Sequence, residues 1–302
     1  MIELIFVIVI MGVLAKFGVE FLAQAYNNFI LSKTNNTLQS QSASAVETIA
    51  SRLQYRIKDS IIARENTLNF QGLPSSTYGD NARVLEWIAS DIEGFRGHEW
   101  PLHSGHSWPL WSGIIDLKAS TATLLKSPES NTTALNTQIK ALSHGSGTDI
   151  NDTALYFVGS NSDIGGYGWG GAITDQNSAM HPIKAAGIDE FIPVNGATKE
   201  SNSFAGIDVY EFYQLAWTAY AVVHSEDGNL SLHYDYQPWN GDTYLVKADG
   251  SATKNNLIMQ NVSTFRFKAI GSVVKIQVCV KSDIIDANED GGYSLCKEKT
   301  IF

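Results

Sequence analysis

The chain has 302 residues, of which 17% are charged and 11% are aromatic, and it contains 25 glycines. This composition argues against a disordered chain and indicates a folded protein rich in loops and strands. The formal net charge of −10, with no basic stripe to offset it, argues against nucleic acid as a partner.

The first 25 residues are the most apolar part of the chain. No polar side chain occurs from Leu4 to Ala15. Lys16 and Glu20 lie four residues apart, so they can partly neutralise each other on one helix face. A helix over residues 2–25 is long enough to span a bilayer, which requires about 20 residues. The alternative is a secretory signal peptide, but residues 1–3 supply no basic segment for one.

The apolar pattern changes after residue 25 but stays helical. Val46, Ile49, Leu53, Ile57 and Ile61 are spaced by three or four residues, which is typical of one stripe of an α-helix. The spacing predicts one helix from about residue 2 to about residue 62, roughly 90 Å long. We therefore expect an apolar segment (1–25), an amphipathic continuation (26–62) and a globular head (63–302).

The beginning of the chain resembles the class III N-terminus of type IV pilins and of type II secretion pseudopilins. In that family an Ile-Glu-Leu core opens an apolar helix, and Ile2-Glu3-Leu4 matches this core. The resemblance covers residues 1–25. The basic leader, the cleavage-site glycine and the Phe-Thr pair of the family do not precede Ile2 in this sequence, so either the start is truncated or the processing differs from that of the family.

The resemblance implies a filament subunit that works by polymerisation and is not an enzyme. Residues 1–25 would anchor a precursor in the inner membrane and later form the filament core with copies of the same chain. A prepilin peptidase and the inner-membrane assembly machinery would be its partners. The head would lie outside the cytoplasm, in an extracellular filament or a periplasmic pseudopilus.

Glu3 has a specific role in this hypothesis. A carboxylate buried among packed apolar helices requires a cationic partner. The N-terminal ammonium of a neighbouring subunit is the expected partner for filament assembly. Such a head-to-tail contact, when it does not close into a ring, produces a helical filament.

The head shows the pattern of an antiparallel sheet. Residues 84–90 read as a short helix or strand, and residues 215–225 and 230–237 flank an Asp227-Gly228 turn as in a β-hairpin. Further strands are expected at 243–247, 262–270, 273–280 and 299–302. The fold class is therefore α+β, with a long helix packed on a large antiparallel head, as in pilins.

The C-terminal region carries two further expectations. Cys279 and Cys296 would form a disulfide in an exported head, and many type IV pilins have a similar one. Between them, Asp286, Asn288 and Asp290 fit the start of a calcium loop, although the twelfth position is Lys297 rather than Glu. A solvated acidic turn is the favoured interpretation, and the resemblance to pseudopilins, which hold calcium near their C-terminus, supports the alternative of a calcium site.

Two other motifs have both a functional and a structural interpretation. His98, His103 and His106 invite a zinc site, but their spacing fits no regular motif, and an aromatic loop packed on the head is favoured. A Gly-x-Gly-x-x-Gly pattern begins at Gly166, but no amphipathic helix follows it, which favours a surface loop over a nucleotide site. In the loop that contains the three histidines, an aromatic platform for sugar would use the side chains Trp100, Trp108 and Trp111.

Five Asn-x-Ser/Thr sequons occur in the chain. Asn131, Asn151 and Asn229 also have an acidic residue two positions upstream, which is the longer acceptor motif of some bacterial oligosaccharyltransferases. This pattern has two interpretations. The three sites are glycosylated, or they are three unmodified acidic loops.

The sequence leaves several functions in competition. A filament shaft subunit is the first, and a minor pilin or pseudopilin that primes or tips the filament is the second, because a large head crowds a shaft. A surface adhesin or carbohydrate-binding head on a pilin stalk is the third. An enzyme on a membrane anchor is a more remote alternative.

Overall fold

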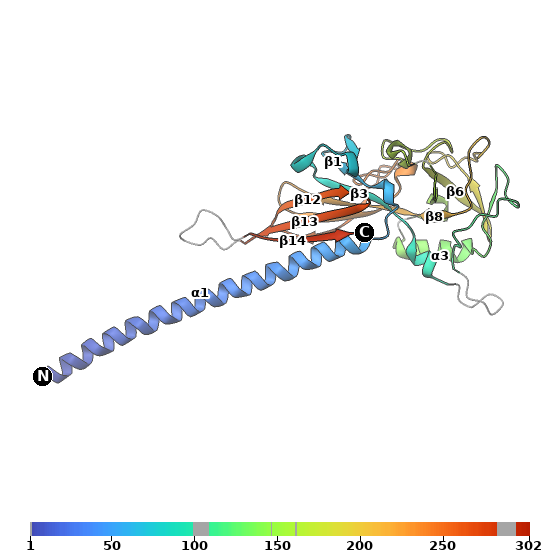
Figure 1. Ribbon diagram of the computed structural model, residues 1–302. Helices are drawn as coiled ribbons and strands as arrows, with labels where there is room; N and C mark the ends of the chain where they lie inside the picture. Colours follow the sequence, from blue (N-terminus) through green and yellow to red (C-terminus); the bar gives the residue numbers. More distant parts are fainter. Residues whose placement is uncertain (1, 99–108, 146, 161, 283–293) are drawn as a thin grey trace.

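A computed structural model describes residues 2–98, 109–145, 147–160, 162–282 and 294–302. The chain folds as α+β, with one long N-terminal helix and a head of antiparallel sheets (Figure 1). The helix extends from the head as a rod, and only its C-terminal part lies against the sheets. The expected fold class is confirmed.

The helix α1 covers Ile2–Leu53, 52 residues, and continues through both of its glycines. It ends nine residues before the predicted end near residue 62, so the predicted boundary was wrong. After Leu53 the backbone turns, and the N–H of Ile57 donates to the carbonyl of Ile88 at 2.9 Å. This pairing with the neighbouring strand replaces helical hydrogen bonds. Ile57 and Ile61 have extended backbones on either side of a short 3-10 helix, Lys58–Ser60, and both side chains are buried.

A six-stranded sheet forms the centre of the head. Its order is β11-β10-β9-β3-β1-β2, and every pairing in it is antiparallel. The strands are β1 (Ile62–Arg64), β2 (Phe70–Gly72), β3 (Val84–Ala89), β9 (Thr218–His224), β10 (Leu230–Tyr236) and β11 (Lys254–Met259). The hairpin predicted around Asp227-Gly228 is confirmed as β9–β10. The strand predicted at 243–247 was wrong, since this segment forms only a Val246–Ala252 bridge.

Two smaller antiparallel sheets complete the head. The three-stranded sheet has the order β12-β13-β14, and the five-stranded sheet has the order β4-β7-β6-β5-β8. The strands are β12 (Val262–Ile270), β13 (Val273–Lys281), β14 (Ser294–Ile301), β4 (Leu125–Lys126), β5 (Ala154–Phe157), β6 (Met180–Gly187), β7 (Glu190–Pro193) and β8 (Tyr213–Ala216). Two further helices are α2 (Ile92–Arg96) and α3 (Thr132–Leu142).

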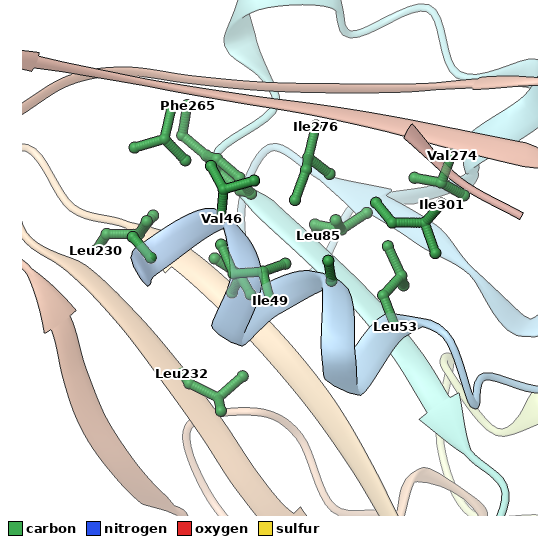
Figure 2. Packing of buried hydrophobic residues seen from close by; sticks show 14 of the residues in the cluster. Val46, Ile49, Leu53, Leu85, Leu230, Leu232, Phe265, Val274, Ile276 and Ile301 are labelled. Carbon is green, nitrogen blue, oxygen red and sulfur yellow. The ribbon is translucent and has the colours of Figure 1, made fainter. Parts of the chain in front are cut away.

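The main core lies where α1 meets the sheets (Figure 2). Val46, Ile49 and Leu53 project from α1 toward Leu85 of β3 and Ile276 of β13. Ile49 and Leu53 are fully buried. Burying such side chains contributes about 1.5–3 kcal/mol each, so this contact fixes the helix to the head.

The central strand β3 separates two cores. Leu85 and Trp87 face the α1 side, whereas Val84 and Ile88 face a second cluster around Tyr167. All six residues of β3 are buried on both faces of the sheet, so the strand shows no regular alternation of apolar and polar side chains in the sequence. A third cluster surrounds the five-stranded sheet and α3.

Candidate functional site: the exposed apolar half of the N-terminal helix

The most unusual surface of the described molecule is the apolar half of α1, which we define as residues 3–31. Apart from the half-buried Ile30, its large apolar side chains are 43–70% exposed. They are Leu4, Ile5, Phe6, Val7, Ile8, Val9, Ile10, Met11, Val13, Leu14, Phe17, Val19, Phe21, Leu22, Tyr26, Phe29 and Leu31. They occupy every side of the helix, so a single partner face would not cover them all.

The contact with the head begins well after this segment. Leu38 is the first buried residue of α1 among those whose burial is described, and Ser42, Ala45 and Val46 follow it. The exposed apolar surface thus continues to residue 31, beyond the boundary expected at residue 25. Exposed apolar area of this extent indicates that lipid or protein covers the apolar half of α1.

The length and composition of α1 are sufficient to cross a membrane. Its most apolar 18-residue window has a mean hydropathy of 2.3 and no residue buried in the head. At 1.5 Å per residue, about 20 residues cover the hydrocarbon core of a bilayer. The apolar half of α1 is therefore compatible with membrane anchoring.

Charged residues are few on this surface. Glu3 lies in the first turn of α1, where a carboxylate interacts favourably with the helix dipole. Lys16 and Glu20 approach to 3.9 Å across one turn. In the described part of the chain, no ion pair involves Glu3.

The disulfide expected near the C-terminus is present. Cys279 and Cys296 are bonded, and they lie directly opposite each other in β13 and β14 with their Cα atoms 4.0 Å apart. The bond joins the two strands that pack on α1. The expected calcium ligands Asp286, Asn288 and Asp290 fall outside the described residues.

The aromatic loop is described only at its two ends. His98 is exposed, whereas His103, His106, Trp100 and Trp108 lie outside the described residues. Trp111 is only 3% exposed, and its Nε1–H donates to the backbone carbonyl and the carboxylate of Asp91, both at 3.1 Å. Its ring packs on Phe95 and Tyr213. Trp111 therefore contributes to the core of the head and offers no open face for a sugar.

The glycine-rich motif has a packing role. A Cβ at Gly168 would lie 2.6 Å from the backbone of Pro238 and Trp239, and one at Gly166 would lie 2.6 Å from the nitrogen of Ala179. Gly168 also has a φ of +87°, which favours glycine. Close backbone contacts explain these two glycines, whereas at Gly171 only its φ of +138° requires glycine.

The three sequons differ in accessibility. Asn131 is buried, and its side chain accepts a hydrogen bond from the N–H of Ala134 as the N-cap of α3. The amide nitrogen of Asn229 donates to Asp227 at 2.6 Å in the β9–β10 turn. Asn151 is exposed. Of the three, Asn151 is the most accessible, Asn229 is half-buried, and Asn131 is closed to a modifying enzyme on the folded head.

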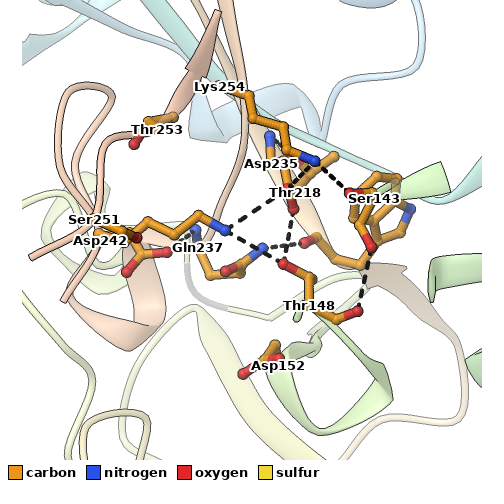
Figure 3. A network of polar contacts seen from close by, with 12 residues as sticks. Ser143, Thr148, Asp152, Thr218, Asp235, Gln237, Asp242, Ser251, Thr253 and Lys254 are labelled. Atoms are coloured by element: carbon orange, nitrogen blue, oxygen red, sulfur yellow. Dashed lines mark hydrogen bonds and ion pairs between the residues drawn. The ribbon is translucent and has the colours of Figure 1, made fainter. Parts of the chain in front are cut away.

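A buried polar network joins elements that are distant in the sequence (Figure 3). Asp235 in β10 is fully buried, has a φ of +62°, and accepts a 2.8 Å hydrogen bond from the hydroxyl of Thr148. The Nζ atoms of Lys254 and Lys247 lie 3.4 and 3.7 Å from its carboxylate. These contacts offset the cost of burying the charge, and they fit a structural role. No local motif in the sequence marks this network.

Comparisons with known protein families, with curated proteins and with solved structures give no match. The proposals below therefore depend on the geometry of the chain and on its motifs.

Proposed function

We propose that this chain is a structural subunit of a type IV pilus-like filament, assembled by packing of the apolar halves of α1. The observation that carries this proposal is the large apolar surface over residues 3–31, which has nothing in its own described chain to pack on. Lipid covers this surface in the inner-membrane precursor, and neighbouring copies cover it in the filament. The Ile2-Glu3-Leu4 core supports the same assignment.

The arrangement of the head is consistent with this function. The packed part of α1 is held by the buried stripe around Ile49 and by Arg56, which donates to the carbonyl of Ser272 at 2.8 Å. The apolar half thus projects from a rigid attachment and is free to contact other copies. Work by polymerisation requires no catalytic group, and we propose no enzymatic activity.

The size of the head supports a second candidate function, that of a minor subunit at the tip of the filament or in its priming complex. The head follows α1 from residue 54, and the part of it that the structure describes forms three sheets. A head of this size fits the tip of a filament or its priming complex, where it does not have to pack laterally along a shaft.

Electron microscopy of producing cells, with an antibody to the head, tests the proposal. Labelling along extracellular filaments supports a shaft subunit, and labelling at filament ends supports a tip subunit. A matched variant lacking residues 2–31 should give no labelled filament. Head labelling confined to the membrane, with no filament in the wild type, would overturn the proposal.

A further inference from the structure

The charged residues on the apolar half of α1 differ in whether a residue of opposite charge lies beside them. Lys16 is the only cation in residues 3–31, and it has a carboxylate neighbour in Glu20 at 3.9 Å. Glu3 has no ion pair in the described part of the chain. The side chains of Lys16 and Glu20 are 76% and 56% exposed, so the ammonium remains open to a second carboxylate.

Helix geometry prevents Glu3 and Lys16 from pairing within one chain. They are 13 residues apart, which corresponds to about 20 Å along the axis. At 100° per residue, their side chains point about 140° apart around the helix. One copy of α1 therefore presents Glu3 on one side and Lys16 on nearly the opposite side.

We propose that Lys16 of one copy binds Glu3 of the next copy, while it keeps its contact with its own Glu20. This inference rests on the proposed filament function and names the contact that sets the axial register. Two parallel helices make the contact when they are shifted by about 20 Å along their axes.

The opposite placement of the two groups favours an open assembly. Each copy uses Glu3 toward one neighbour and Lys16 toward the other, so the same contact repeats from copy to copy. A head-to-tail contact that uses two different patches produces a filament unless its rotation closes a ring. A single staggered pair of parallel helices leaves one Glu3 and one Lys16 without a partner, and each of them can bind a further copy.

Electrostatics restricts the choice of partner. A carboxylate buried in an apolar helix bundle without a cation is strongly unfavourable. The next cation along α1 is Lys33, about 45 Å from Glu3 along the axis. A contact with an N-terminal ammonium that lies within one helical turn of Glu3 would require an axial shift of only a few ångströms. The two contacts therefore predict clearly different staggers between neighbouring helices.

Charge reversal in the full-length chain tests the pairing, in cells that assemble wild-type filaments. We expect Glu3→Lys and Lys16→Glu each to reduce filament mass about tenfold or more, because each leaves like charges facing each other in an apolar core. The triple variant Glu3→Lys/Lys16→Glu/Glu20→Lys reverses all three charges, so it restores both the contact between copies and the contact at 3.9 Å within the helix. It should recover filaments to within about twofold of the wild type. Lys33→Glu, outside the apolar half, should assemble normally. Membrane fractionation checks that each variant is inserted.

Subunit-resolution imaging of wild-type filaments gives a readout that does not depend on any variant. A stagger of about 20 Å with Glu3 beside Lys16 of the neighbour supports the pairing. Wild-type filaments with a different stagger, normal assembly of Lys16→Glu, or failure of the triple variant would overturn the pairing and leave the filament function intact. The absence of wild-type filaments would overturn both.

Discussion

Arg64 and Glu86 form an ion pair in the interior of the head, with side chains only 3% and 0% exposed. The Arg64 guanidinium also lies over the rings of Phe70 and Trp169, and the hydroxyl of Tyr236 donates to Glu86 at 2.8 Å. Burial raises the pKa of Glu86, whereas Arg64 lowers it. Burying this ion pair costs free energy of desolvation. Removing one partner costs more, because the other charge is then buried without a counterion.

We expect Arg64→Met to reduce the free energy of unfolding by about 3–5 kcal/mol, because it leaves Glu86 buried without its cation. Chemical denaturation at neutral pH measures the change. Arg266→Met is the matched control, because Arg266 pairs with Asp80 on the surface at 2.8 Å. The control should lose no more than about 1 kcal/mol. Equal losses in the two variants would contradict this explanation.

His181 is a second buried titratable residue. It is 2% exposed, packs on the rings of Phe157 and Phe204, and its Nδ1 lies 3.2 Å from the Oε1 of Gln176. Burial lowers the pKa of His181 to about 4, from 6.5. The folded state therefore holds a neutral imidazole over a pH range in which the unfolded chain binds a proton.

The lowered pKa of His181 should make the folded protein less stable at acid pH. As the pH falls from about 6.5 to about 4, the unfolded state gains the proton first, so stability should fall by about 3 kcal/mol in total. Thermal unfolding across this range should show a weaker dependence in His181→Gln than in the wild type. His98→Gln, at an exposed position, should keep the wild-type dependence. An unchanged acid slope in His181→Gln would contradict the assignment.

At the scale of elements, α1 combines two surfaces with different partners. Its C-terminal part packs on β13 and β14 through the stripe that includes Ile49, and its apolar half contacts nothing in the described head. The disulfide joins the same two strands at directly opposite positions. The attachment of the helix and the integrity of this small sheet therefore depend on each other.

Truncation of α1 side chains should have opposite consequences in the two parts. Ile49→Ala should destabilise the head by about 2–5 kcal/mol, because Ile49 is fully buried in the main core. Phe29→Ala removes a side chain that is 62% exposed, so the unfolding of the head should not change. Denaturation followed by tryptophan fluorescence measures both. A large loss in Phe29→Ala would show that the apolar half packs on the head.

Removal of the disulfide should lower stability without changing the fold. Cys279→Ser/Cys296→Ser opens a loop with a sequence separation of 17, which is worth about 3 kcal/mol in the chain-entropy model. The melting temperature should fall in the double variant and in the reduced wild type by similar amounts. Reductant should have no further effect on the double variant. A reduced wild type that melts like the oxidised protein would contradict this prediction.

For the whole molecule, the exposed apolar half decides the state of association. Leu38 is the first buried residue of α1 among those whose burial is described, so removal of residues 2–31 deletes no side chain described as buried. We expect the truncated chain to be a folded monomer in water, while the full chain requires detergent or lipid or forms assemblies. Analytical ultracentrifugation measures the difference. Association of the truncated chain would place the contact surface on the head instead.

The extent to which the sequence predicted the fold depended on how local each signal was. The uninterrupted apolar run after Glu3 and the Asp227-Gly228 turn act on neighbouring residues, and both predictions agree with the structure. The helix end at Leu53 was missed, because Ile57 keeps the helical spacing but pairs with β3. Residues 243–247 have strand composition but lack a strand partner, so they form a loop.

The sequence by itself determined the long helix, its apolar first half with Glu3 and Lys16, and the cysteine pair, because hydrophobic periodicity and charge placement are written in consecutive residues. Only the tertiary structure decided the division of the head into three sheets, the burial of Trp111 and Asn131, and the network around Asp235. Those features join residues that are far apart in the chain. Burial and pairing in them result from competition among many distant segments, which no local pattern records.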